Sequence, residues 1–315
     1  MKKTTKPGLP LRKFGLIFLG LTVVVTLVTS VFPKAGVYRN KLLIKRERLV
    51  EQALSFPSND TLRFTREEIV KRQKEKIQKG EPLVIHVFVP LCDNEYQGIV
   101  PVNEKLGDGR NLITNLYWGA AYGIKTFFKN KTDWKLLVSQ KNVNEHILER
   151  VIFNKKFNNG ADVYLVADAY SGDKMKECLE AFFTAMMGGA VHKAICNGKE
   201  IGFSGKADFL IFNGHNGLMD TRIDLDLKPS TIKDAAVIAC MSGSYFKDKL
   251  SSSGGYPLVT TTNYMAPEGY VLERIVNAWA EMKTPEQIRL EAGAGYNTYQ
   301  KCGINGAARL FSTGW

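Results

Sequence analysis

Two residues suited to nucleophilic chemistry follow hydrophobic runs that have the composition of buried strands. His215 comes directly after the run ADFLIFNG, and Cys240 ends the run AAVIAC. An imidazole that takes the proton of a thiol produces a thiolate, which attacks carbonyl carbon atoms. We therefore predict that His215 is the base and Cys240 the nucleophile, provided that the fold brings them together.

Glycines accompany both residues. Gly214 and Gly217 flank the histidine, and Gly243 follows the cysteine. Glycine lets backbone N–H groups approach a ligand closely, as the stabilisation of a tetrahedral oxyanion requires. This composition is suited to acyl transfer.

Short β-branched runs alternate with longer helical stretches, which predicts an α/β domain with a mostly parallel sheet of about six strands flanked by helices. The expected strands are 82–90, 134–139, 161–169, 207–214, 235–240 and 256–262, and the expected helices are 111–130, 172–187, 267–282 and a C-terminal helix that starts after Thr284. Ligands bind at the carboxyl ends of such strands. Because consecutive parallel strands often lie side by side, His215 and Cys240 should meet at one edge of the sheet.

The two motifs resemble those of the caspase-like cysteine peptidases, a group that includes caspases, legumains, gingipains and separases. The signature of that group is a hydrophobic strand ending in His-Gly and a second one ending in Ala-Cys, often followed by Ser-Gly and an aromatic residue. The second motif is present as ACMSGSYF from Ala239 to Phe246, whereas Asn216 stands where the group usually has glycine. The resemblance covers residues 82–282 in strand order.

The resemblance implies a caspase-like α/β/α sandwich that needs no cofactor and no metal. Cys240 would be the nucleophile, and His215 the general acid and base that protonates the leaving amine. The oxyanion hole would consist of the N–H group of Gly217 or Asn216 together with that of Cys240.

Three further residues are candidates for a substrate pocket. Asp93 and Glu95 lie in the loop after the first expected strand, where their carboxylates could bind a basic side chain. Tyr264 follows the last expected strand and would lie at the same edge. Such a polar loop is alternatively a solvated turn.

The N-terminal part of the chain has the pattern of a membrane protein. A basic tail (1–13) precedes the uncharged run 14–32, which is long enough for a helix that crosses a bilayer. We expect a basic helical stalk at 33–80 and the soluble domain at 81–315. This predicts a single-pass protein of the plasma (inner) membrane, or a secreted protein if residues 1–30 are removed. Both flanks of the run are basic, so its orientation is left open.

The charge distribution argues against nucleic acid as a partner. The net charge is +12, and residues 1–80 contain 18 Lys and Arg against 6 Asp and Glu. The rest of the chain contains 25 of each sign and is therefore neutral, whereas phosphate-backbone binding needs clustered cations. A basic segment beside an apolar one suits anionic lipid headgroups instead.

Together these features predict a membrane-anchored cysteine endopeptidase acting on protein or peptide substrates. Two alternatives remain, because a fold alone does not fix a function. One is a catalytically inactive caspase-like binding or scaffold module, and the other is a small-molecule hydrolase on a doubly wound sheet. The oligomeric state is left open.

Overall fold

The computed structural model describes residues 64–226 and 228–315. The expected tail, the expected anchor at 14–32 and the first part of the stalk lie outside these residues. Within the described part of the chain, no helix combines the length and the apolar character needed to cross a membrane.

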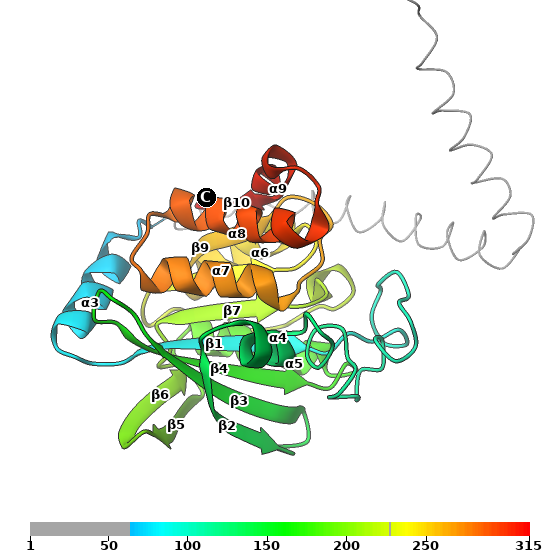
Figure 1. Ribbon diagram of the computed structural model, residues 1–315, viewed down its shortest axis with the longest axis horizontal. Coiled ribbons are helices and arrows are strands. Elements are labelled where there is room, and N and C mark those ends of the chain that lie inside the picture. The colour runs from blue at the N-terminus through cyan, green and yellow to red at the C-terminus, as the bar shows by residue number, and fades with distance from the viewer. Residues whose placement is uncertain (1–63, 227) are drawn as a thin grey trace, which may run out of the picture. The chain divides into compact units, whose positions relative to one another are not determined.

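The domain is built on an eight-stranded mixed sheet with the order β10-β9-β8-β7-β1-β4-β3-β2 (Figure 1). The five strands from β9 to β4 in this order are parallel, whereas β10, β3 and β2 pair antiparallel with their neighbours. The strands are β1 (Leu83–Pro90), β2 (Lys135–Lys141), β3 (Ile147–Lys156), β4 (Asp162–Tyr170), β7 (Phe209–Asn213), β8 (Lys233–Ile238), β9 (Gly255–Thr261) and β10 (Phe311–Ser312). The mostly parallel α/β architecture is confirmed.

The expected count of about six strands is too low. The sequence of β3 is interrupted by Glu149 and Arg150, which hide its strand pattern. In the fold, the carboxylate of Glu149 accepts a hydrogen bond from the indole of Trp118 at 2.8 Å, and Arg150 forms a bidentate pair with Asp168 at 2.6 and 2.7 Å. Strand β10 has two residues and exists through its pairing with β9.

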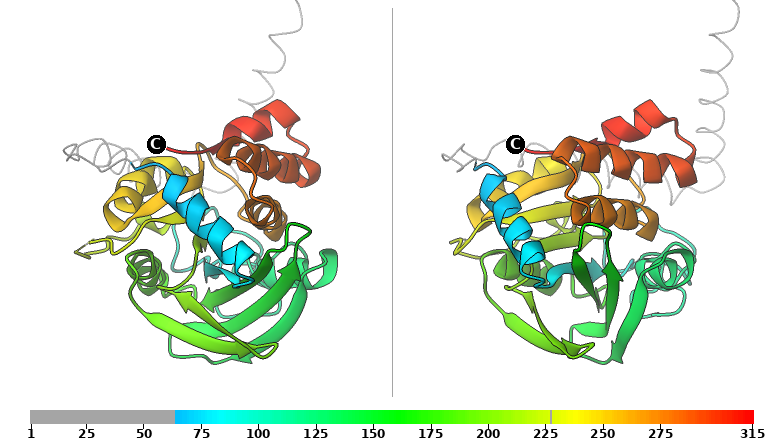
Figure 2. Two further views of the ribbon diagram at one scale, coloured as in Figure 1. Left: turned by 90° about the vertical axis from the view of Figure 1, so that its left-hand side faces the viewer. Right: turned by 60° about the vertical axis from the view of Figure 1, so that its left-hand side comes forward.

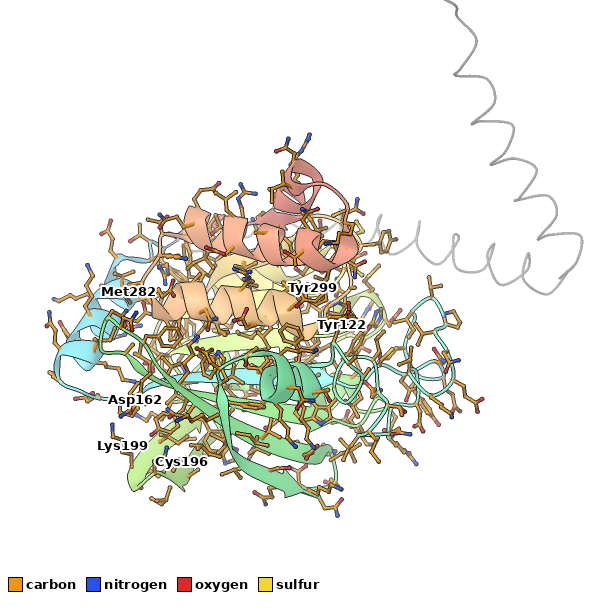
Figure 3. The ribbon with its side chains drawn as sticks, in the orientation of Figure 1. Tyr122, Asp162, Cys196, Lys199, Met282 and Tyr299 are labelled. Carbon is orange, nitrogen blue, oxygen red and sulfur yellow. The ribbon has the colours of Figure 1, made fainter. Side chains whose placement is uncertain are left out.

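A separate hairpin, β5 (Val191–Cys196) and β6 (Lys199–Ser204), lies below the main sheet in the view of Figure 1. Nζ of Lys199 lies 2.7 Å from Oδ2 of Asp162 at the start of β4, so an ion pair attaches the hairpin to the main sheet (Figure 3). The guanidinium of Arg150 also lies over the ring of Phe203, 4.7 Å from its centroid.

Helices cover both faces of the sheet, as expected for an α/β/α sandwich. One face packs against α4 (Ile124–Lys131), α7 (Gly269–Ala280) and α8 (Pro285–Gln300), and the other against α5 (Met175–Met186) and α6 (Ser242–Ser253); a short helix α9 (Ile304–Leu310) follows α8. Side chains of β1 alternate between the two cores, because successive strand residues point to opposite faces.

The helix expected at 111–130 begins only at Ile124. The preceding residues form turns at the carboxyl end of β1, because the Asn115 side chain binds this segment to the strand end. Its Oδ1 accepts the N–H of Cys92 at 3.1 Å, and its Nδ2 donates to the Cys92 carbonyl at 2.8 Å. The helical periodicity of residues 111–123 therefore does not produce a helix, because the buried Asn115 amide bridges this segment and the end of β1.

Helix α3 (Glu67–Gln78) crosses the edge of the sheet at which β1, β7 and β8 begin (Figure 2). Nε of Arg66 lies 2.7 Å from Oδ1 of Asp234, and Nζ of Lys76 lies 2.6 Å from Oδ2 of Asp208. Ile69 is buried. This part of the expected stalk is therefore packed against the domain.

Candidate active site

The Gly-His and Ala-Cys motifs lie side by side at the carboxyl edge of the sheet. Strands β7 and β8 are parallel neighbours, and Asn213 pairs with Ile238 at their ends. His215 and Cys240 each follow two residues later, so both lie at the same edge of the sheet. Adjacent strands are about 4.8 Å apart. The topology thus places an imidazole and a thiol in one site.

A buried amide joins the two motifs directly. Nδ2 of Asn216 donates to the carbonyl oxygen of Cys240 at 2.7 Å, and Asn216 has no exposed surface. Glycine, which the resemblance leads one to expect at this position, could not make that bond. Asn216 was a candidate through its backbone N–H, but its side chain has a second role, because it fixes the spacing between the two strand ends.

The thiol of Cys240 is held by the backbone of Met265. Its Sγ lies 3.4 Å from the Met265 nitrogen and 3.5 Å from the Met265 oxygen. Burial raises the pKa of Cys240 above its ordinary value. Within the described residues, no hydrogen bond joins Cys240 to His215. The resting thiol is therefore protonated, and it needs a base to become a nucleophile.

Cys240 lies at a sharp turn between β8 and α6. Met241 adopts left-handed backbone angles (φ 50°, ψ 32°) and is the N-cap of α6, and its N–H donates to the Asn263 carbonyl at 2.9 Å. Such a conformation is unfavourable for a residue with a side chain and is typical of functional sites. The N-terminus of α6 carries partial positive charge, which favours a thiolate close to it.

His215 has a carboxylate partner that sequence reasoning did not identify. Nε2 of His215 lies 2.5 Å from Oδ2 of Asp220. An ionised carboxylate only accepts hydrogen bonds, so Nε2 carries a proton, and in the neutral imidazole Nδ1 has the lone pair. This is the tautomer that can take a proton at Nδ1. The available signal was an acidic residue five positions after the histidine, across the single turn η1 (Gly217–Met219).

Asp220 is itself held by the loop that follows β1. The N–H of Gly98 donates to Oδ2 of Asp220 at 2.9 Å. A Cβ atom at Gly98 would lie 2.5 Å from Oδ1 of the same carboxylate, so only glycine permits this approach. The loop thereby fixes the group that orients the histidine.

Gly217, a candidate for the oxyanion hole, begins the turn η1. The first N–H groups of a helical turn have no acceptor within it, which leaves them available to a ligand. Gly217 is also required for packing, because a Cβ atom there would lie 2.3 Å from Sδ of Met175. Its identity therefore has a structural reason that is independent of catalysis.

The three pocket candidates have different surroundings. Oδ1 of Asp93 accepts the N–H groups of Glu95 and Tyr96 at 2.8 and 3.0 Å, and Asp93 is buried. Its carboxylate therefore stabilises a turn, as in the alternative reading of this loop. Glu95 is exposed, and Tyr264 is about half exposed and precedes Met265, which contacts the thiol.

A buried acid that the sequence did not indicate follows the segment that contacts the thiol. Glu268 follows Met265 by three residues, and burial raises the pKa of its carboxyl. Its Oε2 accepts the hydroxyl of Tyr270 at 2.6 Å. The Tyr270 ring stacks on Tyr299 at 4.3 Å between centroids. The Tyr299 ring in turn meets the Tyr122 ring edge to face, with the centroids 5.2 Å apart (Figure 3). These rings form an aromatic cluster that joins α7, α8 and the segment before α4.

In residues 64–226 and 228–315, no group of three or more His, Cys, Asp and Glu side chains is placed to hold a metal ion. Comparison of the chain with protein-family models, with curated proteins and with solved structures finds no match.

Proposed function

We propose that this chain is a cysteine endopeptidase of the caspase-like type, anchored to a membrane through residues 14–32. The observation that supports it best is that His215 and Cys240 follow the ends of two adjacent parallel strands, each two residues after the paired residues Asn213 and Ile238. A nucleophile, a base and a carboxylate that orients the base are the minimal set for acyl transfer by a thiol. Protein or peptide chains are the proposed substrates.

In the proposed reaction, Nδ1 of His215 takes the proton of Cys240, and the thiolate attacks the carbonyl carbon of the peptide bond. The tetrahedral oxyanion would bind the N–H groups of Cys240 and of Gly217 or Asn216. Collapse of this intermediate breaks the C–N bond, and His215 protonates the leaving amine. Water, deprotonated by His215, then hydrolyses the thioester and restores the thiol.

A second candidate is an inactive binding or scaffold module. It is favoured by the contacts of the Cys240 thiol with Met265 and by the raised pKa of that thiol. In the peptidase, substrate binding would have to release Sγ from Met265. In the scaffold, the contact would be permanent.

Selective alkylation of the thiols separates these candidates. The full-length protein in detergent is treated with iodoacetamide near neutral pH, and each cysteine is quantified by mass spectrometry. Cys302 is exposed and serves as an internal reference, whereas Cys92 and Cys178 are buried. The peptidase predicts that Cys240, although partly buried, reacts faster than Cys302, and that this advantage is lost in His215→Ala.

Cleavage of a peptide library completes the test. Turnover in the wild type that is absent from Cys240→Ala and unchanged in Cys302→Ser supports the peptidase. Slow alkylation of Cys240 in both the wild type and His215→Ala, without turnover, favours the scaffold. Hydrolysis of small esters without cleavage of any peptide would instead indicate a small-molecule hydrolase.

The proposed anchor has its own experiment. Alkaline extraction should leave the full-length chain in the membrane fraction and release a chain that begins after residue 32. Release of both forms would overturn the anchor without affecting the proposed chemistry.

A further inference from the structure

A cavity lies at the opposite edge of the sheet from the candidate active site. Its volume is about 480 Å³, and it is bounded by α3 and by the segments 188–191, 205–208 and 230–233. Strands β7 and β8 begin here, whereas His215 and Cys240 follow their other ends. The cavity is therefore separate from the peptidase site.

Three cations line this cavity, and they come from different segments. They are Arg72 of α3, Lys206 before β7 and Lys233 at the start of β8. The acidic lining residue, Asp208, is already neutralised by Lys76, whose Nζ lies 2.6 Å away, and it also accepts the N–H of Val84 at 2.8 Å. The cavity therefore has an excess of positive charge.

One of these cations is almost completely buried. Lys233 is 4% exposed, and its Nζ donates to the carbonyl oxygens of Gly205 at 2.6 Å and Ala185 at 3.0 Å. An ammonium group has three donors, so these two bonds leave one N–H for a ligand. A buried ammonium group without a counter-ion is unfavourable, and a bound anion would supply one.

The electrostatics of Lys233 agree with this arrangement. Burial lowers its pKa to about 8, with further lowering by the charges of Lys206 and Arg72 and an opposing effect of Asp208. Cations that repel one another across a cavity are the usual setting for an anion site.

The side chain of Gln73 provides an independent indication of a ligand. It is 2% exposed, it lines the cavity, and neither its Nε2 nor its Oε1 has a hydrogen-bond partner within the described residues. Buried amides are nearly always hydrogen-bonded. An oxyanion in the cavity would accept from Nε2 of Gln73 and from the three cations.

We infer that this cavity binds a phosphate group, which joins α3 to the sheet. Several cationic donors from separate segments, together with an amide donor, are suited to the oxygens of a phosphate. Free inorganic phosphate and the headgroup of an anionic phospholipid share this chemistry. The inference is independent of the proposed peptidase activity.

The test uses the full-length chain in nanodiscs of phosphatidylcholine, alone or mixed with phosphatidylglycerol. Amide hydrogen exchange of α3 is measured with and without inorganic phosphate, at constant ionic strength set with chloride. Added protection by phosphate in the neutral discs supports a site for the free ion. Protection by phosphatidylglycerol that phosphate does not increase supports the headgroup.

Two variants and one control make the result specific. Lys206→Ala removes an exposed cation and should weaken phosphate binding about tenfold. Gln73→Met keeps the volume of the side chain, should not destabilise the empty protein, and should also weaken binding. Lys79→Ala removes an exposed cation at the C-cap of α3 that does not line the cavity, and should change nothing. Equal effects of all three variants, or no protection by either phosphate source, would overturn the inference.

Discussion

Oδ2 of Asp220 lies 2.5 Å from Nε2 of His215, and the same carboxylate accepts the N–H of Gly98 at 2.9 Å. The base of the candidate site is thus oriented by a residue from its own turn and, through it, by the loop after β1.

Replacement of Asp220 by Asn should reduce kcat on the order of 100-fold, with little change in KM, because the imidazole loses the partner that selects its tautomer. Asp220 is a positioning residue, so Asp220→Glu should restore part of the rate. Asp224→Asn, a change at a nearby exposed carboxylate, is the control. A higher KM with an unchanged kcat in Asp220→Asn would contradict this role. Equal reductions of kcat in Asp220→Asn and Asp224→Asn would also contradict it.

Gly98→Ala should reduce kcat without unfolding the domain. The new Cβ atom would lie 2.5 Å from Oδ1 of Asp220, so the carboxylate must move, whereas Gly98 itself is exposed. Combined with Asp220→Asn, it should cause little further loss, because both changes act through the same carboxylate. Steady-state kinetics of the two single variants and the double variant measure this coupling. Fully additive losses would refute the link.

Arg66→Met should destabilise the domain by about 3–5 kcal/mol, because it leaves the fully buried carboxylate of Asp234 without its cation. The indole of Trp279 also donates to that carboxylate at 2.8 Å, but a neutral donor does not replace the charge. Urea unfolding followed by circular dichroism gives the difference in free energy. Lys193→Met, which breaks an exposed pair with Glu200, should cost less than about 1 kcal/mol.

The stability of the domain should rise with pH above about 8 because of Lys233. Burial lowers the pKa of this residue in the folded state from 10.5 to about 8. Between these values the unfolded chain binds the proton and the folded chain does not, so the free energy of unfolding increases with pH. Below about pH 8 both states are protonated, and the full cost of burying the charge remains.

The rise attributable to Lys233 should be on the order of 3 kcal/mol and should be absent from Lys233→Met. Urea unfolding of both proteins in phosphate-free buffer, at several pH values between about 7 and 10, gives the difference. Buried tyrosines such as Tyr117 have raised pKa values and oppose this trend at high pH, but they are common to both proteins. Parallel pH profiles of the two proteins would disprove the assignment.

Much of the fold was accessible from the sequence, because the central strands are short apolar runs buried on both faces. All six expected strands are present, and so are the helices α5, α7 and α8. The capping box of α8 forms between Thr284 and Gln287. The pattern failed where charged residues are paired by the fold, as at Glu149 and Arg150 of β3, since periodicity treats every charge as exposed.

The sequence by itself determined the chemistry of the candidate site: a Gly-His and an Ala-Cys motif, each at the end of a hydrophobic run. Strand pairing decided that these ends are neighbours, and side-chain contacts across long sequence separations decided the rest. The carboxylate of Asp220 accepts a hydrogen bond from Gly98, 122 positions away, and the thiol of Cys240 contacts the backbone of Met265. Likewise, Gln73 and Lys233 share a cavity only because α3 packs across the start of β8. Such contacts leave no local pattern in the sequence, because they join residues that are far apart along the chain and meet only when the chain folds.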